Sequence, residues 1–162
     1  MNTDQFWNLI ETAGEGTTDS SVLIDRLKNA LASLPAEEIQ DFETQLNQRL
    51  TESYRWDLWA VAYIVNGGSS DDGFEYFRGW LISQGRAYFE AALRDPQRAA
   101  DRAEFDANEC EDIIYVAASI YKEKTGEYPP PPENPIPLEP AGEPWEEDDL
   151  EELYPDLCKR FS

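Results

Sequence analysis

The chain has 162 residues, of which 41% are hydrophobic, and a formal charge of −21 from 34 acidic and 13 basic residues. This length and apolar content suit one folded domain with room for a tail, and they exclude a fully disordered chain. The negative field repels phosphate backbones and anionic lipids but attracts basic proteins, so we expect no nucleic-acid or membrane binding.

Three amphipathic helices are predicted before Tyr54, because apolar residues recur there at three- and four-residue steps. Their N-termini are expected at Asn2, within Thr17–Asp19, and at Pro35 or Ala36, which are residues suited to helix starts. The apolar stripes are Phe6, Leu9, Ile10 and Ala13; Val22, Leu23, Leu27, Ala30 and Leu31; and Ile39, Phe42, Leu46 and Leu50.

Three further helices are predicted in the aromatic-rich middle of the chain. The first runs from Tyr54 to Asn66 and stops at the following glycine pair, which tolerates positive φ. The second starts within Ser69–Asp72 and reaches Gly85, which is a break or a close packing point. The third continues to Asp95–Pro96, where Asp95 is placed to cap the next turn.

The last predicted elements are a short helix from Pro96 to about Ala103 and a long helix from about Asn108 to Thr125, which Gly126 ends. Prolines beginning at Pro129 then favour extended chain. Residues 127–162 hold 11 acids and two bases, a net charge of −9. We therefore predict an all-α fold. Residues 1–126 form a compact bundle of about six to seven helices, and residues 127–162 form a Pro-rich, acidic, largely irregular tail that is partly docked on it.

The stretch from Tyr54 to Pro96 carries the most specific motifs. They are Trp56-Asp57-Leu58-Trp59, Gly67-Gly68, Ser70-Asp71-Asp72 with Phe74, Tyr76-Phe77-Arg78-Gly79-Trp80-Leu81-Ile82, Gly85 and Asp95-Pro96. Together they resemble an uncharacterised bacterial family, domain of unknown function 4240, and the likeness covers roughly residues 1 to 126. The resemblance implies a small, mostly helical bacterial domain. It supplies no activity, ligand or catalytic residue.

A candidate binding surface is predicted from the ten aromatic residues between Tyr54 and Phe89, which are too many to face one core. Exposed aromatic side chains beside an arginine are typical of protein contact sites. The alternative is an aromatic-rich core with ordinary helix capping, in which Arg78 pairs with a nearby aspartate. The candidate residues are Trp56, Asp57, Trp59, Tyr63, Ser70, Asp71, Asp72, Tyr76, Arg78 and Trp80.

Several chemistries are disfavoured by the residue types. The chain has no histidine, which removes Ser-His-Asp catalysis and ordinary zinc sites. Acids between Glu104 and Asp112 are better explained as solvated charge than as ligands of a hard cation. Cys110 and Cys158 match no metal spacing, and the acids beside Cys110 are expected to raise the pKa of its thiol. We predict no cofactor, no metal and no catalytic residue.

The leading functional hypothesis is a non-enzymatic acidic interaction protein, of the immunity or adaptor kind, that binds a basic protein partner. Two alternatives stay open. One is a small-molecule or peptide-binding module with a pocket around Arg78 and neighbouring tryptophans. The other is a carboxylate-based enzyme that uses Asp57 with Asp71 or Asp72. A cytoplasmic location is expected, because the N-terminus lacks the pattern of a signal peptide and no apolar run is long enough to cross a bilayer. The oligomeric state is left open.

Overall fold

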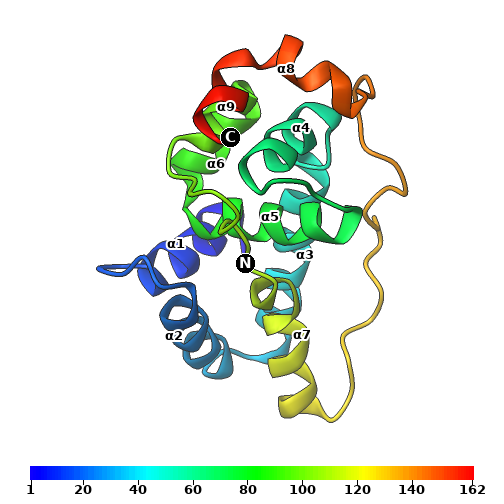
Figure 1. Cartoon of the computed structure of the whole chain (residues 1–162). Coiled ribbons are helices and arrows are strands. Elements are labelled where there is room, and N and C mark those ends of the chain that lie inside the picture. The colour runs from blue at the N-terminus through cyan, green and yellow to red at the C-terminus, as the bar shows by residue number, and fades with distance from the viewer.

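The computed structural model describes all residues from Met1 to Ser162 and contains helices and loops without a β-sheet (Figure 1), which confirms the predicted all-helical fold. Two 3-10 helices, η1 (Pro96–Ala100) and η2 (Glu147–Asp149), accompany the α-helices. The α-helices are α1 (Thr3–Ala13), α2 (Ser20–Ala32), α3 (Ala36–Glu52), α4 (Trp56–Val65), α5 (Asp71–Ser83), α6 (Arg86–Arg94), α7 (Asp112–Thr125), α8 (Leu150–Leu153) and α9 (Pro155–Arg160).

Local capping explains where several helices begin. At α1 the Asn2 side chain accepts from the Gln5 backbone at 2.8 Å, and the Gln5 side chain accepts from the Asn2 backbone at the same distance. Asp19 caps α2, and Ser70 caps α5 by accepting from the Gly73 backbone at 3.1 Å. These contacts satisfy N–H groups that have no partner inside the helix. They confirm the predicted starts of all three helices.

Two predicted boundaries are wrong, and both errors lie after α6. The helix predicted from Pro96 to Ala103 is the shorter η1. The last long helix begins at Asp112 instead of Asn108, because Asn108 is buried and is held by tertiary contacts. Its Nδ2 donates to Asn66 Oδ1 at 2.9 Å and to the Glu104 carbonyl oxygen at 2.6 Å. These two bonds hold it in the loop before α7.

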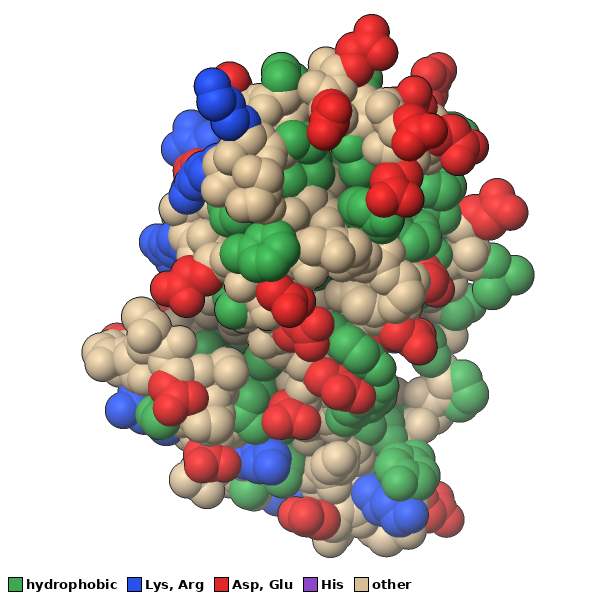
Figure 2. All heavy atoms as spheres, viewed as in Figure 1, with side chains coloured by type: hydrophobic (Ala, Val, Ile, Leu, Met, Phe, Trp, Pro, Cys, Tyr) green, Lys and Arg blue, Asp and Glu red, His purple; other side chains and the backbone are tan.

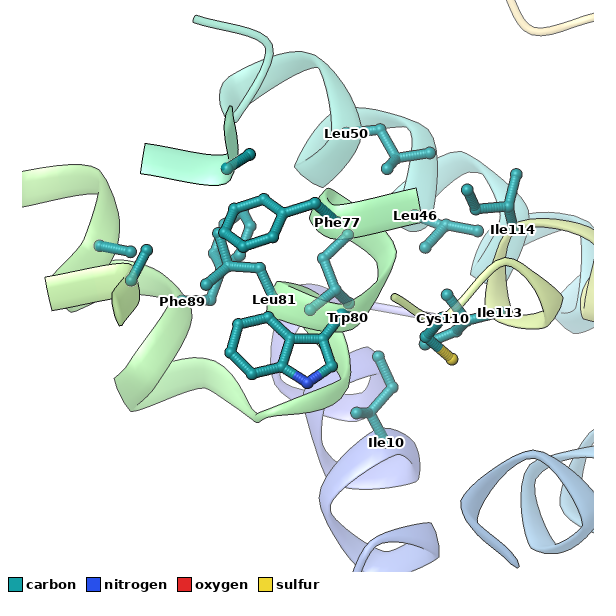
Figure 3. Close-up of a cluster of buried hydrophobic side chains, with 14 of the residues drawn as sticks. Ile10, Leu46, Leu50, Phe77, Trp80, Leu81, Phe89, Cys110, Ile113 and Ile114 are labelled. Atoms are coloured by element: carbon teal, nitrogen blue, oxygen red, sulfur yellow. The ribbon is translucent and has the colours of Figure 1, made fainter. Parts of the chain in front are cut away.

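The core is one contiguous cluster of 38 buried residues, part of which is shown in Figure 3. The packing of α7 against both α2 and α3 closes one side of it. Phe42, from a predicted apolar stripe, is fully buried in this interior together with Phe77 and Ile113. Trp59 is only partly buried, because it lies at the rim among other aromatic rings.

The chain after α7 takes a long path back across the molecule. It runs without helix along one side of the bundle and then forms α8 and α9 near α4 and α6 (Figure 1). Residues 129–134 pass beside α3, with which they share a pocket. The end of the segment is anchored by Leu150, Leu157 and Phe161, which are buried. The C-terminal residues thus become part of the core of the bundle.

The surface is dominated by acidic groups. Figure 2 shows Asp and Glu side chains spread over the whole of one face, whereas Lys and Arg lie mainly along its left and lower edges. None of the helices is both long enough and apolar enough to span a bilayer.

Candidate functional site

The aromatic side chains of α4 form a stack at the surface end of the core. The Trp56 and Trp59 rings are stacked, with centroids 5.1 Å apart and planes 13° apart. Trp59 stacks in turn on Phe74 of α5, at 5.2 Å and 13°. The Trp59 Nε1 donates to the Ser69 carbonyl oxygen at 2.9 Å, which ties the stack to the turn before α5. The turn before α5 and helix α4 are therefore joined through this aromatic stack.

The outer side of this stack is covered by Trp145, from the segment after α7. The Trp145 ring makes T-shaped contacts with the rings of Trp56, Trp59 and Tyr63, at centroid distances of 5.8, 6.4 and 5.5 Å. Its Nε1 donates to the Trp56 carbonyl oxygen at 2.6 Å. The predicted binding residues Trp56, Trp59 and Tyr63 are therefore half-buried beneath the protein's own C-terminal segment.

A short backbone pairing fixes the same contact. Ala141 and Arg55 form an isolated parallel bridge. The Trp56 N–H donates to the Ala141 carbonyl oxygen at 2.9 Å, and the Ala141 N–H donates to the Tyr54 carbonyl oxygen at 3.0 Å. The pairing satisfies the Trp56 N–H, one of the free donors at the N-terminus of α4.

The predicted aspartates serve local structure. Asp57 accepts two hydrogen bonds from Arg55, at 2.8 and 3.0 Å, and so forms a bidentate ion pair. Asp71 accepts from the Tyr54 hydroxyl at 2.8 Å, and both Asp71 and Asp72 are exposed. Only Asp57 among the three lines one of the five main pockets. Asp57 therefore shares none of these five pockets with Asp71 or Asp72.

Arg78 lies in the interior, where it was not expected. The prediction that it pairs with Asp57, Asp71 or Asp72 is wrong, since it is 3% exposed and makes no ion pair. Its guanidinium lies over the Tyr54 and Phe74 rings, 4.5 and 4.9 Å from their centroids, and donates to the Leu50 carbonyl oxygen.

Arg78 lines none of the five main pockets of the molecule. Burial lowers the pKa of Arg78 to about 10, and the nearby Glu75 carboxylate partly offsets that effect. The guanidinium has a packing role between α3 and α5.

Tyr76 and Trp80 point away from the α4 stack. Tyr76 lies near Glu111 and Tyr115, and burial followed by the Glu111 charge raises the pKa of its hydroxyl to about 12. Trp80 packs at the other end of α5, against Tyr88 of α6. The ten predicted residues therefore do not form one surface: Trp56, Trp59 and Tyr63 lie together, whereas the side chains of α5 point in several directions around its axis.

The acids before α7 and the two cysteines are the remaining candidates for a metal site or a nucleophile. No group of three or more acidic or cysteine side chains is placed to hold a metal ion. Cys110 and Cys158 are both free thiols. The pKa of Cys110 is raised to about 11, as expected in direction, but burial is the main cause and the Asp112 charge is a minor one.

The cavity that remains beside the aromatic stack is here named the C-terminal groove. It has a volume of about 720 Å³ and lies between the start of α4 and the segment that leads into α8. Four carboxylates and one guanidinium line it, and Leu153 at its edge is 55% exposed. The lining residues are Arg55, Asp57, Ala141, Gly142, Glu143, Pro144, Trp145, Asp149, Glu152, Leu153 and Tyr154.

Of the groove residues, only Asp57 belongs to the predicted surface. The sequence led us to expect only that residues 127–162 are partly docked on the bundle. The sequence pattern did not indicate that Trp145 packs against α4. A contact between residues so far apart in the chain does not affect the spacing of apolar residues in either segment.

Comparison with known proteins places the chain in a family but assigns no activity. The family described as "Protein of unknown function (DUF4240)" matches residues 1–123, which span α1 to α6 and nearly all of α7. Most of the residues that line the C-terminal groove lie beyond this match. No curated protein and no solved structure matches the chain. On the family match, which covers about three quarters of its length, the chain belongs to the DUF4240 family.

Proposed function

We propose that this protein is a non-enzymatic acidic interaction protein, of the immunity or adaptor kind, that binds a basic segment of a partner protein in the C-terminal groove. The observation that carries the proposal is the charge balance of the groove. Its one cation, Arg55, is already neutralised by Asp57. Glu143, Asp149 and Glu152 have no cationic partner.

The groove also offers apolar contacts next to these charges. Leu153 is exposed at its edge, and Pro144 and Trp145 form part of its wall. Lysine and arginine side chains lay their apolar stems on such surfaces while their charged ends reach carboxylates. The partner segment that suits this groove is therefore a basic stretch with interspersed apolar residues.

The charge of the whole molecule supports the same kind of partner. A net charge of −21 accelerates encounter with a basic protein, and screening by salt weakens that attraction. Charge alone does not select one partner, because it acts over the entire surface. Selection requires the short-range contacts with the groove.

The proposal is tested with the full-length protein and a synthetic peptide in which lysine and arginine alternate with leucine, at about 0.15 M salt. The groove variant is Glu143→Lys/Glu152→Lys. The control variant, Glu15→Lys/Glu123→Lys, makes the same change of net charge near the ends of α1 and α7, away from the groove (Figure 1). All four glutamates are exposed.

We expect the groove variant to weaken peptide binding at least about tenfold, and the control to weaken it about twofold or less. Isothermal titration calorimetry measures both affinities. An equal loss of peptide affinity in the two variants would show that the attraction is spread over the whole surface, and the groove would no longer be the binding site. The proposal would also be wrong if the unmodified protein did not bind the peptide.

A further inference from the structure

A second pocket lies on a different part of the molecule, where α1, α2, the end of α5 and the loop after η1 meet. Its volume is about 380 Å³, within the roughly 300–1,000 Å³ range of small-molecule sites. None of its lining residues belongs to the C-terminal groove. Its wall is mainly polar, and it holds one indole, one guanidinium and three carboxylates.

The indole is Trp80, which is 9% exposed. Its ring packs edge-on against Tyr88, at 6.0 Å and 86°. Figure 3 shows the ring nitrogen turned toward Ile10, a lining residue of the pocket on α1. The Trp80 Nε1 donates no hydrogen bond within the protein, unlike that of Trp59 or Trp145. Trp80 therefore lines the pocket and carries an indole N–H that has no acceptor within the protein.

The guanidinium is Arg102, and the same Tyr88 ring holds it. Arg102 lies over that ring, 4.7 Å from its centroid, and its backbone N–H donates to the Tyr88 hydroxyl at 2.9 Å. Its Nη1 reaches the Gln84 carbonyl oxygen at 3.4 Å. Although the chain has 34 acids, Arg102 forms no ion pair. The Trp80 indole and the Arg102 guanidinium are thus held against one ring, and neither contacts a carboxylate of the protein.

Carboxylates from other elements complete the pocket. Glu11, from α1, lies over Gly85 and accepts only one long contact of 3.4 Å, from the Arg86 backbone. Asp19 and Glu109 contribute from the start of α2 and from the loop before α7. One oxygen of Asp19 already accepts from the Ser21 N–H and hydroxyl, at 2.9 and 2.7 Å, as the cap of α2. None of the three has a cationic side-chain partner. The pocket therefore presents acceptors as well as donors.

This combination excludes simple ions as the best ligand. A plain anion suits Trp80 and Arg102 but is repelled by three carboxylates. A plain cation suits the carboxylates but leaves the indole N–H and the guanidinium unpaired. A small molecule with both charges satisfies the two sets together.

We propose that this pocket binds a free α-amino acid. The carboxylate of the ligand contacts Trp80 Nε1 and the Arg102 guanidinium. Its ammonium group contacts the carboxylates of the pocket, chiefly that of Glu11. A planar guanidinium suits bidentate contact with a carboxylate. The remaining volume receives the side chain of the ligand. This proposal is independent of the C-terminal groove.

The test titrates the full-length protein with each of the standard amino acids and follows the indole N–H signals by two-dimensional NMR. Trp80→Phe, which keeps an aromatic ring and removes the donor, assigns the Trp80 signal. We expect at least one amino acid to shift that signal with a Kd below about 1 mM. The amide of that amino acid, which lacks the carboxylate, and its N-acetyl derivative, which lacks the ammonium charge, are expected to bind at least about tenfold more weakly.

Matched variants locate the ligand. Arg102→Gln and Glu11→Gln are each expected to weaken binding at least about tenfold, whereas the exposed controls Arg98→Gln and Glu15→Gln leave it unchanged. The groove variant Glu143→Lys/Glu152→Lys is also expected to leave it unchanged, which separates this site from the groove.

Three results would overturn the amino-acid site. They are binding of no amino acid in this range, equal binding of either derivative, and unchanged affinity in Arg102→Gln or Glu11→Gln. A spectrum of each variant that matches the unmodified protein outside the pocket confirms that the fold is intact.

Discussion

The indole nitrogen of Trp145 donates a hydrogen bond of 2.6 Å to the carbonyl oxygen of Trp56, which precedes it by 89 residues. This bond joins the segment that follows the family match to the aromatic stack inside it. Without the docked segment, the rings of Trp56, Trp59 and Tyr63 would lose their cover, and the C-terminal groove would lose one of its walls. The proposed binding site therefore depends on this long-range contact.

Replacing Trp145 is expected to release the segment. Trp145→Ala removes three ring contacts and the hydrogen bond, so we expect a loss of about 2 to 3 kcal/mol in the free energy of unfolding. Trp145→Phe keeps a ring and loses the bond, for about 1 kcal/mol. Urea titration measures both losses, and hydrogen exchange at the Ala141 N–H reports the docking itself. Unchanged protection of that N–H in Trp145→Ala would contradict the expectation.

Gly79 is expected to tolerate no side chain. A Cβ at this position would lie 2.5 Å from the Cys110 carbonyl oxygen and 3.0 Å from a methyl group of Ile113. Because the first neighbour is backbone, Gly79→Ala forces α5 and the start of α7 apart. We expect it to lower the free energy of unfolding by about 1 to 3 kcal/mol.

The same substitution at Gly73, on the same helix, is the control. A Cβ there meets only two serine hydroxyls, at 3.4 Å. Alanine favours helix over glycine by up to about 1 kcal/mol, so Gly73→Ala is expected to be neutral or stabilising. Thermal melting of the two variants compares them directly, and equal melting temperatures would mean that the close approach at Gly79 carries no strain.

Glu43 is expected to make stability depend on pH. One of its carboxylate oxygens is buried without a hydrogen-bond partner, and burial raises the pKa of the group from 4.5 to about 7. Between these values the folded protein holds a proton that the unfolded chain has released. The free energy of unfolding therefore falls as pH rises from about 4.5 to about 7, by at most about 3 kcal/mol, and levels off above.

Glu43→Gln removes this titration and is expected to stabilise the protein above pH 7 relative to the unmodified chain. Urea titrations at several pH values measure the effect. Glu38→Gln, an exposed change on the same helix, controls for the loss of one charge. A pH dependence that is identical in the unmodified protein and in Glu43→Gln would assign it to other groups.

Arg78 is expected to be replaced more easily by methionine than by lysine. Methionine fills a similar volume and removes a buried charge that has no ion pair, so we expect a cost of about 1 kcal/mol or less. Lysine keeps the charge but loses the planar contact with Tyr54 and Phe74, for about 2 kcal/mol. Guanidinium titration ranks the two variants. A more stable lysine variant would show that the charge itself stabilises the fold.

The helices and most of their ends were predictable because their causes are local. Asn2, Asp19 and Ser70 cap helices through contacts within three residues, and Gly126 ends α7 in a left-handed conformation. Apolar residues at three- and four-residue steps marked the buried face of each helix. The error at Asn108 has the opposite cause, since its partner Asn66 is 42 residues away.

The sequence by itself therefore determined an all-helical, strongly acidic chain, its helix caps and most of its core. Only the tertiary structure decided that Arg78 is buried without an ion pair, that Trp145 covers α4, and that Trp80 and Arg102 meet at Tyr88. The physical reason is that a residue's spacing selects the face of its own helix, whereas the group that packs against that face comes from a distant part of the chain. That pairing is settled by the packing of all the helices together.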